Sequence, residues 1–153
     1  ILLYRFSGVL ASLALLVYAI IVLAIFKSIP VTLTLSGIAG FVMTIGIAVD
    51  ANVLVFERMR EESKNGKSLM ASLEDGFSRA WPSIRDSNIS TLITSGILFW
   101  FGSSIIRGFA LTLAIGIVVS MFSAITISRT FLLSVVSPAL ERYKWLFLSG
   151  ITR

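Results

Sequence analysis

The sequence has no cysteine, no histidine and little charge, because only 14% of its 153 residues are Asp, Glu, Lys or Arg. Without cysteine the chain can form neither disulfides nor thiolate metal sites. Without histidine it lacks the side chain that most often carries protons near neutral pH, so any proton transfer must use carboxylates. No nucleophile–base pair, glycine-rich phosphate loop or cluster of metal ligands can be assembled from the remaining residues. We therefore expect no enzyme activity, no metal site and no organic cofactor.

Apolar residues dominate what is present. They make up 56% of the chain, and the mean hydropathy is +0.95, whereas a soluble domain is roughly half apolar and about 25% charged. Four stretches approach or exceed the ~20 residues that an α-helix needs to cross a bilayer. They are residues 7–26, 31–56, 84–101 and 109–136. The sequence therefore predicts an all-α membrane protein, with residues 1–153 forming a single domain built as a four-helix transmembrane bundle.

Basic residues are distributed unevenly between the two sides of this bundle. Most of them lie between the second and third spans or flank the outer ends of the first and fourth, and only Lys27 and Arg107 lie in the turns on the opposite side. By the positive-inside rule, both ends of this segment and the long loop at 57–83 are cytoplasmic. The net charge of +5 follows from this bias, so it does not indicate a nucleic-acid partner.

The helix of the second span is expected to run on past residue 56 into the cytoplasm. Its charged sequence ERMREE allows Arg58 to pair with Glu62 at i,i+4 spacing and Glu57 to pair with Arg60 at i,i+3. Asn65–Gly66 then breaks the helix.

The rest of the loop at 57–83 is expected to contain a further helix. Leu69, Leu73 and Phe77 repeat at helical spacing among polar residues, which predicts a short amphipathic helix at residues 68–80 on the cytoplasmic membrane surface. A docking site for another protein is the less favoured interpretation. Trp81–Pro82 is expected to end this segment, and the chain restarts there as the third span.

One acid, Asp50, lies inside the apolar second span. A carboxylate at that depth is costly unless it has a partner or a proton, and intramembrane acids commonly mark ion or proton pathways. Loss of hydration favours the protonated carboxyl and an approaching cation favours the ionised one, so Asp50 could gain and lose a proton. The alternative is a neutral Asp50 that hydrogen-bonds a neighbouring helix for packing alone. The sequence offers no cation at its depth, since Arg129 lies nearer the cytoplasmic end of the fourth span.

Small residues recur at helix-packing spacing in the second and fourth spans. In the second span they lie on the face that leads up to Asp50, whose side chain is therefore expected to point into the bundle. In the fourth span they recur every four residues and form a ridge, which predicts close contact with another span without saying which one. The predicted packing positions are Gly37, Gly40, Gly46, Gly108, Thr112, Gly116, Ser120 and Ala124.

The third span opens with polar residues near its cytoplasmic end. Asp86 either caps the helix, where the helix dipole favours an acid, or supplies a second carboxyl on a hydrated path that also includes Asn88. Ser87, Thr91 and Ser95 share one face of the helix, and such hydroxyls hydrogen-bond between membrane helices.

Two blocks of sequence resemble a known family. Residues 46–62, GIAVDANVLVFERMREE, closely resemble the most diagnostic motif of the SecD family, which are membrane subunits of the bacterial protein-export machinery. Residues 86–94 and 102–121 resemble the other membrane motif of that family. The paired subunit SecF has Asn-Asp-Thr in place of Asp50–Ala51–Asn52, so SecD is the better match.

The resemblance implies part of an RND-superfamily membrane domain, in which these helices correspond to the last four of six spans. It implies a multi-pass subunit in the bacterial cytoplasmic (inner) membrane, acting beside the SecYEG translocon. With SecF, such a subunit uses the proton or sodium motive force to promote export and release of an unfolded polypeptide, so H⁺ or Na⁺ is the expected coupling ion. Asp50 matches the intramembrane acid of the family, and its cationic partner is expected on SecF. Asn52, Asp86 and Asn88 are carried over as polar neighbours on the ion path.

Two alternatives stay open at this point. A drug or lipid exporter of the RND type would carry substrate-lining aromatic residues in a periplasmic domain, which upstream sequence would reveal. A passive membrane scaffold for the translocon would use Asp50 only for structure, so that Asn could replace it without loss. Because the first residue is Ile, we interpret the chain as a piece of a longer protein.

Overall fold

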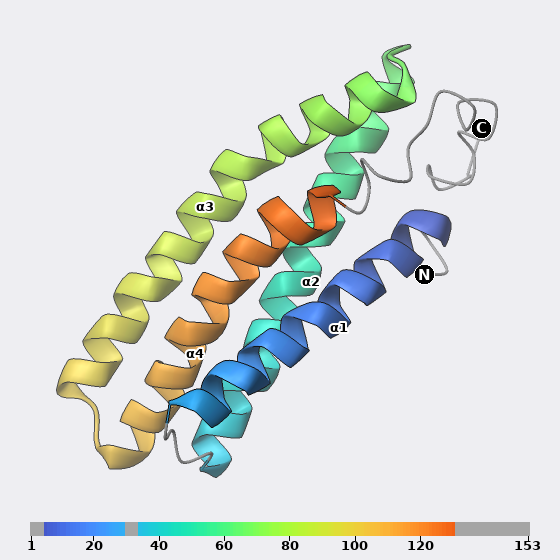
Figure 1. The fold of residues 1–153 in the computed structure, drawn as a ribbon. Helices are drawn as coiled ribbons and strands as arrows, with labels where there is room; N and C mark the ends of the chain where they lie inside the picture. The colour runs from blue at the N-terminus through green and yellow to red at the C-terminus, as the bar shows by residue number, and fades with distance from the viewer. Residues whose placement is uncertain (1–4, 30–33, 131–153) are drawn as a thin grey trace.

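The computed structural model describes residues 5–29 and 34–130. Four α-helices follow one another along these residues (Figure 1). They are α1, Arg5–Ser28; α2, Leu35–Lys64; α3, Leu69–Phe101; and α4, Ser104–Phe122, which continues into a π-helical segment at Ser123–Ser128. The predicted all-α bundle of four helices is confirmed. Parts of two predicted spans, residues 31–33 and 131–136, lie outside the described residues.

Helices α2 and α4 form the centre of the bundle, and α1 and α3 lie on either side of them (Figure 1). Sequence signals set the starts of the two longest helices. The Thr34 hydroxyl caps α2 by accepting a hydrogen bond of 3.2 Å from the amide of Gly37, and the Ser68 hydroxyl caps α3 in the same way. Between these helices Gly66 has φ +85°, a conformation that glycine adopts without steric cost.

The contact between α2 and α4 is made by small residues. A Cβ atom built on Gly40 would lie 2.8 Å from the carbonyl oxygen of Phe109, and one on Gly37 would lie 3.3 Å from Cγ2 of Thr112. Further along, Gly116 of α4 lies against the side chain of Thr44. The helix that receives the small ridge of α4, which the spacing left open, is therefore α2.

A buried tyrosine joins α1 to this central pair. Tyr18 has no exposed surface, and its hydroxyl donates to Oγ1 of Thr44 at 2.7 Å while lying 3.3 Å from the carbonyl oxygen of Gly116. Thr44 in turn donates to the carbonyl oxygen of Phe41 at 2.7 Å. Because every one of these polar groups has a partner, hydrogen bonds offset the cost of burying the hydroxyls among apolar helices.

Helix α3 is longer than the sequence patterns indicate. Residues 69–80 are helical, with Ser68 as the N-cap, but they do not form a separate helix. They continue without interruption into the predicted third span at residues 84–101, with Pro82 inside the helix. The expected break at Trp81–Pro82 is therefore wrong.

Packing on α2 explains why the helix continues through the proline. A proline in a helix interior costs about 3 kcal/mol or more, but Leu73 and Ile84, on either side of it, are both buried. A Cβ atom on Gly76 would lie 2.8 Å from the backbone nitrogen of Met59, so the two helix backbones nearly touch there. The burial of this face against α2 favours one continuous helix over a break.

Three helices within the described ranges are long and apolar enough to cross a membrane, namely Gly8–Ser28, Leu35–Lys64 and Ser104–Phe122. Helix α3 is not among them. Its sequence from residue 84 onward contains Arg85, Asp86 and Asn88 and five Ser or Thr residues. A membrane-spanning role for residues 84–101 stays a prediction. The apolar helices make the chain a membrane protein, and large aliphatic side chains cover the outer face of α1.

Candidate functional site

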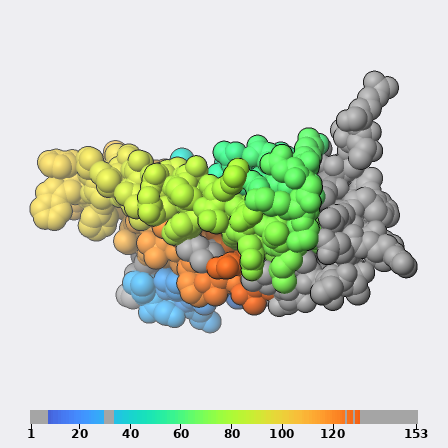
Figure 2. All heavy atoms as spheres, turned by 90° about the horizontal axis from the view of Figure 1, so that it is seen from above, coloured from blue at the N-terminus to red at the C-terminus, as the bar shows by residue number. Residues whose placement is uncertain are grey.

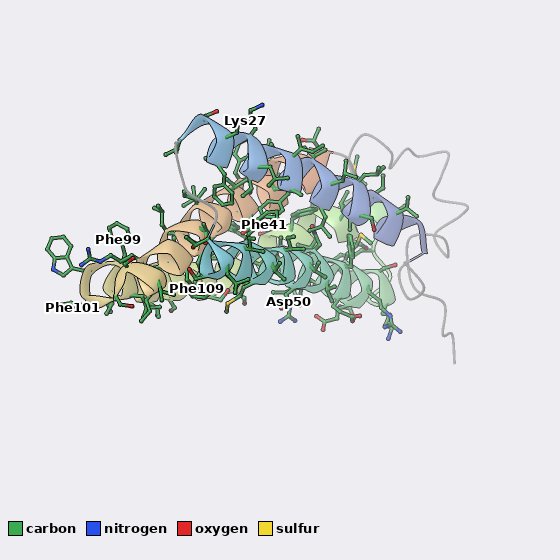
Figure 3. The ribbon with its side chains drawn as sticks, turned by 90° about the horizontal axis from the view of Figure 1, so that it is seen from below. Lys27, Phe41, Asp50, Phe99, Phe101 and Phe109 are labelled. Carbon is green, nitrogen blue, oxygen red and sulfur yellow. The ribbon has the colours of Figure 1, made fainter. Side chains whose placement is uncertain are left out.

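Asp50 lies on the outer side of α2, away from α1 (Figure 3). Its side chain is exposed in this chain, so the expectation that it points into the bundle is wrong for these four helices. It lies instead at the edge of a cavity of about 240 Å³ between α2 and α3. The cavity is lined by Ile47, Asp50, Ala51 and Leu54 from α2 and by Ile84, Ser87, Asn88 and Thr91 from α3.

The α3 wall of this cavity is polar. Asn88 is 2% exposed, and its amide has no hydrogen bond to any residue in the described part of the chain, so it can bind a water or an ion. The hydroxyl of Ser87 donates to the carbonyl oxygen of Ile84, and that of Thr91 donates to the carbonyl oxygen of Ser87, both at 3.0 Å. With their protons used in this way, the two hydroxyl oxygens remain hydrogen-bond acceptors.

The other two predicted site residues lie elsewhere. Asn52 is buried and donates to the carbonyl oxygen of Ala48 at 3.1 Å. Two residues along an α-helix correspond to about 200° of rotation, so Asn52 cannot share a face with Asp50. Asp86 is exposed and accepts a hydrogen bond of 2.9 Å from Nε of Arg85. Of the four residues, the structure brings Asp50 and Asn88 together and places Asn52 and Asp86 outside the cavity.

Most of the predicted packing residues lie at a helix contact or are buried, and Gly46 is the exception. Gly37, Gly40, Thr112 and Gly116 lie at the contact between α2 and α4, and Gly108 faces the hydroxyls of Thr34 and Ser36. Ser120 and Ala124 are buried. Gly46 is not at a helix contact, because a Cβ atom there would meet nothing within 4 Å. It lies one turn before Asp50 on the exposed side of α2.

No ion pair joins Asp50 to a basic residue within residues 5–29 and 34–130. Arg129, which the sequence places inside the fourth span, lines a different cavity. The same ranges contain no cluster of three acidic side chains that could hold a metal ion. The oxygen donors gathered near Asp50 are its own carboxylate, the Asn88 amide and the two hydroxyls of α3.

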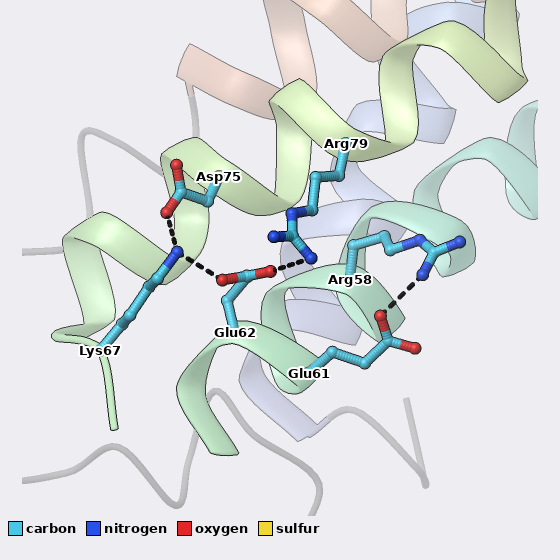
Figure 4. A network of polar contacts seen from close by, with 6 residues as sticks. All are labelled: Arg58, Glu61, Glu62, Lys67, Asp75 and Arg79. Carbon is cyan, nitrogen blue, oxygen red and sulfur yellow. Dashed lines mark hydrogen bonds and ion pairs between the residues drawn. The ribbon is translucent and has the colours of Figure 1, made fainter. Parts of the chain in front are cut away.

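A second polar cluster, which sequence reasoning missed, lies at the charged end of the bundle (Figure 4). Glu62, near the end of α2, is 1% exposed. Its Oε1 lies 2.7 Å from Nη1 of Arg79 in α3, and its Oε2 lies 2.5 Å from Nζ of Lys67. Lys67 also contacts Oδ2 of Asp75 at 2.5 Å. A hydrogen bond to Asp75 and a smaller contribution from a hydrogen bond to Glu62 raise the pKa of Lys67.

These partners differ from one of the two pairs that helical spacing predicts. Arg58 contacts Glu61 at 2.7 Å and not Glu62, because Glu62 turns toward α3. The predicted pair of Glu57 and Arg60 is confirmed, at 3.7 Å. The cations around Glu62 come from the turn after α2 and from α3. Residue spacing along α2 alone cannot predict such contacts, so sequence reasoning misses this cluster.

Together, the fold and the site define a helical membrane protein that carries a carboxylate, Asp50, in the apolar part of α2, beside a partly polar cavity. Comparison with known proteins then gives the family. The sequence profile described as "Protein export membrane protein SecD/SecF, C-terminal" matches residues 1–137. The chain therefore belongs to the SecD/SecF family, as its motifs indicate.

Individual relatives agree with this assignment. The protein translocase subunit SecD of Thermobaculum terrenum is 56% identical, over 98% of this chain and 30% of its own length, and that of Synechocystis is 58% identical, over 87% and 28%. A crystal structure of SecDF, a translocon-associated membrane protein from Thermus thermophilus, matches 95% of this chain and 20% of its own, with a TM-score of 0.82 and 39% identity. The chain thus spans less than a third of the length of these relatives.

Proposed function

We propose that this chain is the ion-coupling part of a SecD subunit of the Sec machinery. Together with SecF and beside the SecYEG channel, it uses the proton or sodium motive force to promote export and release of an unfolded polypeptide. Its place is the bacterial cytoplasmic membrane, with both ends of the segment cytoplasmic. The observation that carries the proposal is Asp50, an acid in an apolar helix that lines a cavity with Asn88 and has no cationic partner among the described residues.

The chemistry follows from the cost of a carboxylate away from water. In general, a carboxyl group that is away from water and has no partner favours its protonated form, and a cation brought close to it favours release of the proton. The Asn88 amide and the oxygens of Ser87 and Thr91 can hold the water or ion that exchanges with the carboxyl. If SecF supplies the cation, ion occupancy of Asp50 depends on how the two subunits are placed. Carrying one charge through 100 mV supplies ~2.3 kcal/mol, which biases such a conformational equilibrium.

The test is Asp50→Asn in the full-length protein, assembled with SecF and SecYEG in vesicles. We expect release of an exported protein to lose its dependence on an imposed ion gradient, while the complex still assembles and ATP-driven translocation persists. Asp86→Asn is the matched control, because Asp86 is an acid of the same bundle that lies outside the cavity, and this variant should keep the gradient dependence.

An unchanged response of Asp50→Asn would contradict the ion-coupling role and favour the passive scaffold. If both variants lost the response equally, the loss could not be assigned to the cavity. The exporter alternative receives no support from the relatives, which are named as protein translocase subunits.

A further inference from the structure

A second cavity of the bundle shares only Ile84 with the Asp50 cavity. It has a volume of about 470 Å³ and lies between the first part of α3 and the segment that follows α4, which are neighbours on the face shown in Figure 2. Its lining is Val55, Phe77, Trp81, Ile84 and Ala124, with Glu74, Ser78 and Arg129 as the polar members. This volume falls within the ~300–1,000 Å³ of typical small-molecule sites.

The cavity has one acid and one base that are not paired. Glu74 and Arg129 are both exposed, and neither forms an ion pair with another residue of the described ranges. The neighbouring charges of α3 are already used, since Asp75 contacts Lys67 and Arg79 contacts Glu62. A ligand that carries both a positive and a negative group would therefore complement this cavity.

The position of the cavity along the bundle gives the class of ligand. Gly76 touches Met59 of α2, so Glu74, two residues earlier in the antiparallel α3, lies level with the charged end of α2. Ile84, ten residues after Glu74, lies about 15 Å further into the apolar part of the bundle. Trp81 lies between these levels, where tryptophan favours the membrane–water interface. The lining of the cavity thus changes from charged to apolar along the bundle, as a phospholipid changes from its headgroup to its acyl chains.

We propose that this cavity binds a zwitterionic, amine-bearing phospholipid of the phosphatidylethanolamine type from the adjacent leaflet. The phosphate is held by the Arg129 guanidinium, the ammonium by the Glu74 carboxylate, and the start of an acyl chain lies against Phe77, Trp81 and Ile84. An anionic lipid without an amine fits less well, because its headgroup leaves Glu74 without a cation. The site is independent of Asp50, so the proposed function and this inference can fail separately.

The test is native mass spectrometry of the full-length complex, released from bilayers that contain equal amounts of phosphatidylethanolamine and phosphatidylglycerol. We expect the wild type to retain phosphatidylethanolamine preferentially, and Glu74→Gln to reduce that preference about tenfold, as expected for loss of one charge-assisted hydrogen bond. Arg129→Gln should weaken retention of both lipids, and Arg129→Lys should largely restore it. Asp86→Asn, on the same helix but outside the cavity, is the control and should change nothing.

Two further variants, at Ser78, test occupancy of the cavity without removing charge. Ser78 lines the cavity and is exposed, so Ser78→Phe should fill the space and displace the lipid, whereas Ser78→Ala should not. Equal retention in wild type and Ser78→Phe, or a lipid preference unaffected by Glu74→Gln, would overturn the proposal. Either result would mean that this cavity does not hold the phospholipid in the way proposed.

Discussion

Replacement of Gly40 by alanine is the sharpest available test of how α2 packs on α4. The added methyl carbon would lie 2.8 Å from the carbonyl oxygen of Phe109 and 3.3 Å from the amide nitrogen of Leu113. Both atoms belong to the α4 backbone, so neither can rotate away and the helices must move apart. Inserting a methyl into a close-packed contact typically costs ~1–3 kcal/mol.

Gly46→Ala is the matched control for this change. It lies in the same helix, but its methyl group would meet nothing within 4 Å. Glycine to alanine in a helix is by itself favourable by about 0.5–1 kcal/mol, and this contribution is common to both variants. The difference in unfolding free energy between Gly40→Ala and Gly46→Ala should therefore equal the overpacking cost alone, about 1–3 kcal/mol in favour of Gly46→Ala.

The measurement is unfolding of the full-length protein in mixed micelles with rising SDS content, followed by tryptophan fluorescence. The Gly40→Ala variant should unfold at the lower SDS fraction, and Gly46→Ala at or above that of the wild type. Equal midpoints for the two variants would show that α2 and α4 can separate at Gly40 without cost, which would refute the close backbone contact.

Three further predictions concern the polar groups of the bundle. Glu62→Gln should destabilise the protein by about 2 kcal/mol, less than the ~3–5 kcal/mol of a fully buried pair because Arg79 is partly exposed. A double-mutant cycle with Arg79→Gln checks this, and strict additivity would contradict it. Hydrogen bonds to Asp75 and Glu62 raise the pKa of Lys67 in the folded protein. The contribution of Lys67 to folding stability should therefore be complete below its unfolded-state pKa of about 10.4, and it should be lost as pH rises through its folded-state pKa. Alkaline unfolding of Lys67→Met should lack this component. Tyr18→Phe should cost ~1 kcal/mol by removing a buried hydrogen bond, measured by SDS unfolding, and an unchanged midpoint would exclude that bond.

Periodicity and composition predict the helices well, because the length of an apolar span depends on local sequence. The alternative in which Asp86 caps the third span is wrong, because Asp86 lies in the interior of α3. They predict the facing of each helix poorly, and Asp50 illustrates the reason. In a soluble protein the apolar face of a helix is the buried one, but in a membrane the lipid-facing side is apolar too. The residues around Asp50 therefore gave no sign that its face is exposed in this chain, and Gly46 on that face was assigned to packing.

Other features depend on contacts between helices. The continuity of α3 through Pro82 results from its packing on α2 near Gly76, and local propensity argues against it. The cations around Glu62 come from the turn and from α3, so they are set by how α3 returns along α2. The cavity wall was partly visible in advance, because Ser87 and Thr91 repeat at helical spacing, but its pairing with Asp50 required the relative placement of the two helices.

The two faces of α2 have different roles in the proposed function. One face, with Gly40 and Thr44, is closed against α4 and is fixed by backbone contacts. The opposite face, with Gly46, Val49 and Asp50, is exposed in this chain, although a carboxylate turned toward lipid is costly. A second set of helices that covers this face would remove that cost and, if it carried a cation, would also control the charge on Asp50. The rigid contact with α4 would then hold the acid in place while the covering subunit moves, which is the arrangement that the proposed pairing with SecF requires.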